Sequence, residues 1–245
     1  MRYGKVIRFA KLTSMSGTDK FTIWLSKSYI WLFNLAVAIF VGLPFLAPVF
    51  MNAGLELPAK IVYTLYSPLC HQFPFRSLFL FGEQPYYPRE LAGLPYEITY
   101  EDVEQRETIN VLTARKFVGD DFTGYKVALC ERDLALYGAI LVFGLLFAVS
   151  RRRIKALKWY IWLVIGILPM AVDGVSQLPG LMTGYLPELL IRESTPLLRY
   201  ITGSLFGFTT AWYLYPMIEE TMRDSVNYVM YKSEKVSIQD EKNAF

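Results

Sequence analysis

Four long stretches of the chain carry almost no charged residues, and they constrain the fold more than any other feature. They cover residues 29–51, 134–150, 159–181 and 196–217. As a helix rising about 1.5 Å per residue, the first would extend about 34 Å, enough to cross a hydrocarbon core about 30 Å thick. The second is shorter, but helix can extend back toward Cys130. The third and fourth contain one charge each, Asp173 and Arg199. The pattern predicts four transmembrane helices.

Composition agrees with a membrane protein. Hydrophobic residues make up 53% of the chain, and Tyr and Trp cluster beside the apolar runs, as interfacial aromatic belts do. The first run is longer than the apolar region of a signal peptide, and no small-x-small cleavage site follows it, so we expect a retained anchor. Pro44 and Pro48 predict a kink in its second half. The net charge of +3 is small and indicates no nucleic-acid partner.

Basic residues set the expected orientation. The cluster between Arg151 and Lys158 contains no acidic residue, so we expect it in the cytoplasm. The basic N-terminal segment 1–28 and the mixed-charge tail 218–245 then also lie in the cytoplasm. Residues 52–130 lie outside, and residues 131–217 hold the last three helices.

The external segment divides into two parts. Residues 57–81 are rich in Leu and aromatics, and we interpret them as an interfacial or re-entrant helix followed by an extended piece. Within residues 96–129, the stretch 96–103 alternates with period two, and Thr108–Val118 and Tyr125–Leu129 are β-branched and polar in turn, with turn residues between them. Together they predict a small antiparallel β element. The expected fold is an all-α membrane protein, a four-helix transmembrane bundle with a small external β-containing insertion.

A set of polar residues is not explained by membrane spanning alone, and the topology places all of it near the external side. We take as pocket candidates Gln72, Arg76, Ser77, Arg132, Asp133, Tyr137, Asp173, Gln177, Arg199 and Thr202. Helical spacing places the candidates of each helix on one side of it. From its distance along the third run, Asp173 would lie about 9 Å below the outer boundary of the hydrocarbon.

An ionised residue in hydrocarbon costs about 2.5–3.5 kcal/mol by insertion scales, so Asp173 and Arg199 need a reason to be there. One interpretation is a buried ion pair that locks the third helix to the fourth. The other is that both line a polar cavity open to the outside, with Gln177, Thr202 and Arg132 adding hydrogen-bonding groups. We expect the second, because the polar set is larger than one pair needs.

The two cysteines allow three interpretations. Cys70 and Cys130 both lie in the expected external segment, where a disulfide could form. Alternatively, Cys70, His71 and Cys130, with Asp133 or Asp173, could hold zinc or another transition metal, since zinc accepts mixed sulfur, nitrogen and oxygen ligands. The thiols could also be free. No nucleophile elbow, P-loop, GxGxxG or HExxH motif occurs, so no catalytic template applies.

Taken together, the polar motifs resemble the small membrane proteins grouped as domain of unknown function 2085. The resemblance covers roughly residues 60–210, leaving out much of 83–125. The motifs are Cys70-His71-Gln72 with Arg76-Ser77, Cys130-x-Arg132 with Tyr137, Asp173-Gly174-x-x-Gln177, and Arg199-x-x-Thr202-Gly203. The resemblance implies that these positions belong together and suggests a prokaryotic plasma membrane, but it implies no reaction. The chain departs from the pattern in its longer stretch before Cys130 and at Glu131 and Asp133.

We therefore expect a polytopic protein with a polar pocket near the outer leaflet that binds a metal or a small polar or anionic group. Two alternatives remain open at this point. One is an accessory subunit of a larger membrane complex that docks through the external insertion. The other is a metal- or thiol-dependent membrane enzyme. Gly203 and Gly207 form a small-xxx-small pair, which predicts close helix packing within the bundle or against another subunit.

Overall fold

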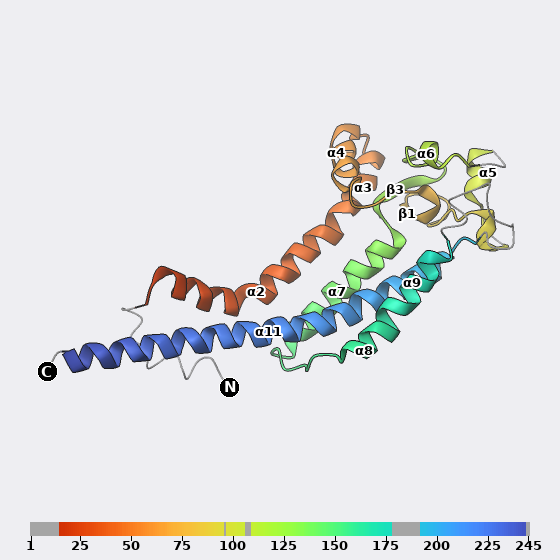
Figure 1. Ribbon diagram of the computed structural model, residues 1–245. Coiled ribbons are helices and arrows are strands. Elements are labelled where there is room, and N and C mark those ends of the chain that lie inside the picture. Colours follow the sequence, from red (N-terminus) through yellow and green to blue (C-terminus); the bar gives the residue numbers. More distant parts are fainter. Residues whose placement is uncertain (1–14, 96, 106–108, 178–191, 244–245) are drawn as a thin grey trace.

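A computed structural model describes residues 15–95, 97–105, 109–177 and 192–243. The chain is mostly helical, with one small three-stranded sheet. Figure 1 shows a long helical body with a cap of short helices and strands at one end. The body contains α2 (Gly17–Gly42), α7 (Glu131–Val149), α8 (Trp159–Ile161), η4 (Trp162–Ile167), α9 (Leu168–Val175) and α11 (Pro196–Asn243). The cap contains η1 (Leu43–Phe45), α3 (Leu46–Asn52), α4 (Glu56–Tyr66), η2 (Pro74–Arg76), β1 (Ser77–Leu80), η3 (Glu90–Ala92), α5 (Tyr100–Glu104), α6 (Val111–Ala114), β2 (Gly119–Asp120) and β3 (Gly124–Cys130).

Helix α2 begins well before the first apolar run. Ser16 and Asp19 form a reciprocal capping box that supplies partners for the first free backbone N–H groups. The helix therefore includes residues 17–28, which the charge pattern assigned to a basic N-terminal segment; residues 1–14 lie outside the described residues. At its other end α2 gives way to a 3₁₀ turn that contains Pro44, in the half of the run where the prolines predict a kink.

Close packing of α7 on α11 depends on two glycines. A Cβ at Gly203 would lie 2.5 Å from the carbonyl oxygen of Arg132, and one at Gly207 would lie 2.0 Å from that of Leu136. No side chain fits there, so the helix backbones can touch only because these positions are glycine. Of the two predicted roles of the pair, the structure shows packing within the chain.

Helix α11 is far longer than the fourth apolar run. It continues to Asn243, through most of the mixed-charge tail 218–245. Its distal part packs against the start of α2, where Met15, Ile23 and Val229 form a small buried cluster. Pro216 lies inside the helix. The third run is helical from Trp159 to Val175 and includes a π-helical turn; its last residues, 178–181, lie outside the described residues.

The cap contains a sheet, but its strands differ from the predicted ones. The strand order is β1-β3-β2, all antiparallel, and β1 comes from the segment expected to follow the interfacial helix. The prediction of strand in residues 96–103 and 108–118 is wrong where these residues are described: Thr99 and Asp102 form a capping box that starts α5, and Val111–Ala114 forms α6. A short run of alternating apolar character cannot distinguish a strand from a helical turn. Tyr96 and residues 106–108 lie outside the described residues.

A buried lysine holds the cap loops together. Lys126 on β3 is 1% exposed, and its Nζ donates to the carbonyl oxygens of Gln72 (2.7 Å) and Arg115 (3.0 Å). Burial lowers the pKa of Lys126 to about 7, since desolvation disfavours the charged amine. The lysine thus ties the Cys-His-Gln segment to β3 and to the loop after α6.

Two helical segments among the described residues are long and apolar enough to cross a membrane. They are Gly17–Asn52, which spans α2 to α3, and Glu131–Val149, which is α7. Only 22% of each apolar window is buried in the chain, so neither resembles the core helix of a soluble protein. Trp159–Val175 is apolar but shorter, and α11 does not reach the same mean hydropathy. The predicted bundle of four spanning helices is thus supported only in part.

The glycine contact yields a direct test. We expect Gly207→Ala to destabilise the protein by about 1–3 kcal/mol, because the added methyl group forces α7 away from α11. Gly138→Ala on α7 is the control, since its Cβ would meet nothing within 4 Å. Thermal unfolding in detergent measures both. Equal stability of the two variants would contradict the contact.

The buried lysine predicts a pH dependence of stability. Between about pH 7 and the ordinary lysine pKa of 10.5, the unfolded chain binds a proton that the folded chain lacks, so stability rises with pH. Lys126→Met should remove this slope, whereas Lys116→Met, an exposed site on the same cap, should keep it. Unfolding midpoints measured across this range decide the point, and an unchanged slope in Lys126→Met refutes it.

Candidate functional site

Polar residues from four distant segments meet where the cap joins the helical body. They come from the loop between α4 and β1, the start of α7, the end of α9 and the residues that lead into α11. Figure 1 shows the ends of α7, α9 and α11 converging under the sheet. The predicted clustering of these motifs is therefore a property of the fold, although their individual partners differ from those expected.

The first group is a buried network of two arginines and two glutamates. Arg76 from the cap holds Glu193 with two parallel hydrogen bonds of 2.8 and 2.9 Å. Glu193 also pairs with Arg199 on α11, whose Nη1 lies 3.2 Å from the Glu131 carboxylate on α7. Arg199 donates in addition to the carbonyl oxygen of Phe75 at 3.0 Å. The network joins the cap, α7 and α11 through charge-assisted hydrogen bonds.

The second group is centred on Asp173 near the end of α9. Its carboxylate pairs with Arg132 of α7, lies 3.5 Å from Arg192, and accepts hydrogen bonds from Gln177 (3.2 Å) and Ser194 (3.1 Å). A direct Asp173–Arg199 pair, one of the two sequence interpretations, is therefore wrong. Each residue of that pair has partners of opposite charge elsewhere, because adjacent helices bring Arg132 and Glu131 closer.

Sequence reasoning missed several of these partners. Glu193, Ser194 and Arg192 lie in the short segment before α11, which carries none of the polar motifs named above. Glu131 attracted attention only as a departure from the family pattern. The charged residues at the ends of the apolar runs could have pointed to Glu131 and Glu193, since an arginine near hydrocarbon needs a carboxylate nearby.

The two cysteines lie together with Asp133. The sulfur atoms of Cys70 and Cys130 and a carboxylate oxygen of Asp133 are all within 4.8 Å of one another. Both thiols are free, so the structure does not support the disulfide alternative. A disulfide needs sulfur atoms about 2.0 Å apart. Here the Cys130 thiol instead donates to Asp133 at 3.0 Å.

The environment separates the two thiols chemically. Contact with the Cys130 thiol lowers the pKa of Cys70, and the backbone N–H of Gln72 contributes in the same direction. The same contact, together with burial and the Asp133 carboxylate, raises the pKa of Cys130 well above its usual range. Of the pair, Cys70 is therefore the better candidate for a thiolate.

His71 does not join this group. Its ring stacks on Phe73 with ring centroids 5.4 Å apart, and it is exposed, whereas Cys70 is buried. Neighbouring residues cannot easily aim at one point, and here the chain turns sharply at Gln72, which has a φ of 55°. Of the predicted ligands Cys70, His71 and Cys130, the structure brings the two cysteines together, and of the two optional carboxylates it places Asp133 beside them.

Asp133 is the one carboxylate of the junction for which the described residues show no cationic partner. Glu131, Asp173 and Glu193 each lie within 4 Å of an arginine nitrogen. The hydrogen-bond partner of Asp133 is the Cys130 thiol. A partly buried carboxylate beside two sulfur atoms favours a positively charged occupant.

A cavity of about 290 Å³ opens beside this group. Its lining comprises Leu69, Cys70, His71, Gln72, Phe73, Arg76, Cys130, Arg132, Asp133, Met170, Gln177 and Arg199. Three of these residues carry buried atoms for which the described part of the chain offers no hydrogen-bond partner: Nε of Arg132, Nε of Arg199 and Oε1 of Gln177. Buried polar atoms are rarely left unpaired. The cavity thus has unused donors and an unused acceptor in its wall.

The remaining candidates have structural roles. Ser77 donates to the carbonyl oxygen of Phe73, and Thr202 donates to that of Leu198 in its own helix. Tyr137 packs edge-on against Phe40. The Gln72 amide donates to the carbonyl oxygens of Tyr63 (2.9 Å) and Ala128 (3.1 Å), so it holds the loop in place even though the residue lines the cavity.

Comparison with known proteins agrees with this picture at the level of the family. A family described as predicted membrane proteins (DUF2085) matches residues 117–213, which run from the sheet to the middle of α11. An uncharacterised protein of Methanocaldococcus jannaschii is 30% identical over an aligned length of 203 residues, and the alignment covers 79% of this chain and 95% of the relative. No solved structure matches the chain significantly. The resemblance inferred from the polar motifs is confirmed, and the chain belongs to the family of predicted membrane proteins known as domain of unknown function 2085.

Proposed function

We propose that this chain is a polytopic membrane protein whose junction cavity holds a transition-metal ion, with zinc as the first candidate. The observation that carries the proposal is the convergence of Cys70, Cys130 and Asp133 within 4.8 Å at the wall of a cavity. Two sulfur atoms and one carboxylate oxygen form a donor set that suits zinc, and a fourth position would face the cavity. Three protein ligands with an open position are typical of zinc that binds or activates a further group.

The surface of the body supports its insertion into a bilayer. Exposed apolar side chains follow α2 and α7, including Leu35, Ile39, Val142 and Leu146. On this proposal α2, α7, α8–α9 and the first half of α11 form the four-helix bundle. In α11, Arg199, Thr202 and Thr209 are buried within the chain, which explains how a helix of modest mean hydropathy could still lie in the membrane.

The cap would lie at the outer surface. Helix α4 and the turn after it expose Leu57, Ile61, Leu65 and Leu69, spaced every four residues and so on one side. Such a stripe suits a helix lying in the membrane interface. With the basic cluster 151–158 in the cytoplasm, both chain ends lie inside, in a prokaryotic plasma membrane, and the cavity lies near the outer leaflet.

The unused polar atoms support a second, smaller ligand beside the metal. The Nε atoms of Arg132 and Arg199 can donate, and Oε1 of Gln177 can accept. A small anion that retains one hydroxyl group, such as hydrogenphosphate, would satisfy both donors and the acceptor. A metal-bound group of this kind would also permit the enzyme alternative. The accessory-subunit alternative, with docking through the cap, stays a prediction.

Metal content tests the main proposal. We expect about one equivalent of zinc or another transition metal in detergent-purified protein, and loss of that metal in Cys70→Ser and Asp133→Asn. His71→Ala is the matched control, because it changes a neighbour of Cys70 that lies outside the donor group, and it should retain the metal. Elemental analysis gives the answer. A metal-free wild type, or metal kept by both ligand variants, would rule the site out.

Anion binding is tested separately. In Cys70→Ser protein, inorganic phosphate should still raise the unfolding temperature if the polar wall binds an anion without the metal. Adding Gln177→Leu should reduce that shift, since it removes the acceptor while leaving the arginine network intact. If phosphate has no effect on wild type or on Cys70→Ser, the anion part of the proposal is wrong even where metal is found.

A further inference from the structure

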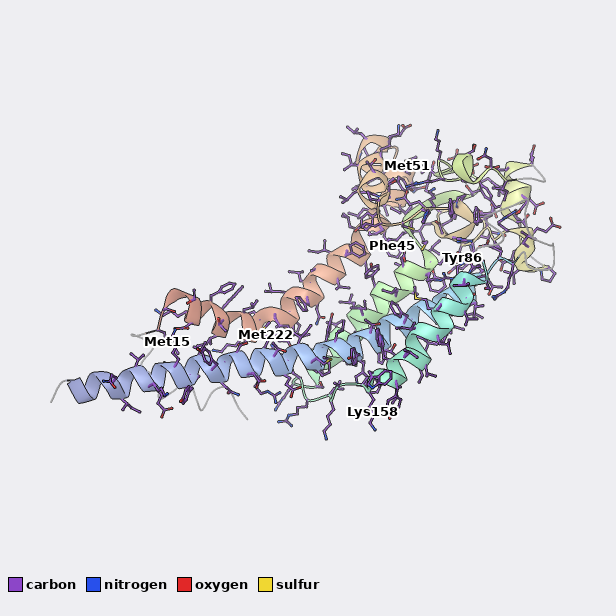
Figure 2. All side chains as sticks on the ribbon, viewed as in Figure 1. Met15, Phe45, Met51, Tyr86, Lys158 and Met222 are labelled. Atoms are coloured by element: carbon purple, nitrogen blue, oxygen red, sulfur yellow. The ribbon has the colours of Figure 1, made fainter. Side chains whose placement is uncertain are left out.

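A second and larger hollow lies away from the cap, beside the middle of α11. Its volume is about 490 Å³, and it is enclosed by residues 152–156, in the connection between α7 and α8, and by Pro216, Glu219, Glu220 and Arg223 of α11. Figure 1 shows this connection lying beside the middle of α11, and Figure 2 shows Lys158 on the body, away from Met51 and Tyr86 of the cap. Neither the metal proposal nor the family assigns this hollow a role.

The first end of the connection is fixed by one arginine. Arg151 and Arg152 both adopt left-handed backbone conformations, with φ of 57° and 60°, which turns the chain out of α7. The Arg152 guanidinium then donates to the carbonyl oxygen of Ser26 (2.8 Å) and lies 3.4 Å from Glu219 and 5.0 Å from the centre of the Tyr29 ring. Two adjacent non-glycine residues in this region persist only where their surroundings hold them.

The other end of the connection is held at a position in α11 where one backbone hydrogen bond is missing. Pro216 has no N–H group, so the carbonyl oxygen of Trp212, four residues earlier, loses its helical partner. The backbone N–H of Leu157 approaches that oxygen at 3.4 Å, and Nε1 of Trp212 donates to the carbonyl oxygen of Lys155 at 3.0 Å. The proline thus creates a docking point for the connection.

Between the two fixed ends, Arg153 and Lys155 are exposed, and the described contacts pair neither side chain with a carboxylate. The lining contains four basic residues, Arg152, Arg153, Lys155 and Arg223, and two acidic ones, Glu219 and Glu220, so its formal net charge is 4 − 2 = +2. Glu219 is already shared by Arg152 and Arg223. The hollow therefore carries excess positive charge, and the backbone of the α7–α8 connection that bears Arg153 and Lys155 is fixed at both ends.

The residues that follow place the hollow at a membrane boundary. Trp159 and Tyr160 are 63% and 47% exposed, and Lys158 lies over the Tyr160 ring at 5.7 Å. Exposed Trp and Tyr beside an apolar helix mark the level of lipid head groups. The next turns expose Leu163, Val164 and Ile165, an apolar surface directly below the charged one.

We propose that this hollow binds the phosphate of an anionic phospholipid, with Arg153 and Lys155 as its principal contacts. The phosphate would sit between the connection and Arg223, and the acyl chains would lie along the exposed apolar side of η4. A lipid fits better than free phosphate because the charged hollow and the apolar surface adjoin, and basic pockets between helices bind lipid head groups in this way. The proposal does not depend on the metal site.

Native mass spectrometry of the full-length protein in detergent tests it, with added phosphatidylglycerol, phosphatidylcholine or inorganic phosphate. We expect one phosphatidylglycerol molecule to be retained, and the double variant Arg153→Gln/Lys155→Gln to weaken its binding by roughly ten- to thirty-fold. The control is Lys20→Gln/Lys235→Gln, which removes the same charge from other parts of α2 and α11 and should bind as wild type does.

Three outcomes would overturn the proposal. Equal weakening in the control variant would show that total charge, rather than this hollow, attracts the lipid. Equal retention of phosphatidylcholine would show that the anionic head group is not recognised. Displacement of bound phosphatidylglycerol by millimolar inorganic phosphate, with the same dependence on Arg153 and Lys155, would assign the hollow to free phosphate instead.

Discussion

The buried network of Arg76, Glu193, Arg199 and Glu131 is the interaction on which the rest of the junction depends. Arg199 is 2% exposed, and an arginine so far from water is tolerated only when carboxylates surround it. Its two carboxylate partners lie on α7 and in the segment before α11, while Arg76 brings in the cap. The network therefore fixes the position of the cap on the body, and the cavity and thiols lie where that position puts them.

The four carboxylates of the junction differ in their partners. Arginines engage Glu131, Asp173 and Glu193, whereas Asp133 lies beside the two thiols. A structural network alone needs only the first three carboxylates. The fourth carboxylate, Asp133, has no such role in the network. Together with the unpaired atoms of Arg132, Gln177 and Arg199, it gives the cavity groups that could bind a ligand. These groups are the physical basis for proposing a metal and a small ligand there.

Proline and glycine act in opposite ways at two places along α11, the glycines near its start and Pro216 in its interior. Gly203 and Gly207 remove side chains so that the α7 backbone can approach, close to the metal candidates. Pro216 removes a backbone donor, so a carbonyl group becomes available to the connection that borders the basic hollow. One long helix thus supports two separate sites. At the glycines the α7 backbone comes close to it, and at Pro216 the connection between α7 and α8 approaches the carbonyl group that the proline leaves unpaired within the helix.

The sequence by itself indicated the membrane character, the family and the polar set, since apolar runs and charges near hydrocarbon are local signals. It also indicated strand at residues 125–129. It left open whether Cys70 lies near Cys130, and the structure places them together. Only the tertiary structure decided the pairings: Asp173 meets Arg132 rather than Arg199. Asp133, and neither His71 nor Asp173, lies beside the thiols. Thr99 starts a helix where alternation suggested a strand. These outcomes depend on how helices rotate against one another and on which backbone groups need caps. Sequence spacing gives the face of each helix but not the neighbour that the face will meet.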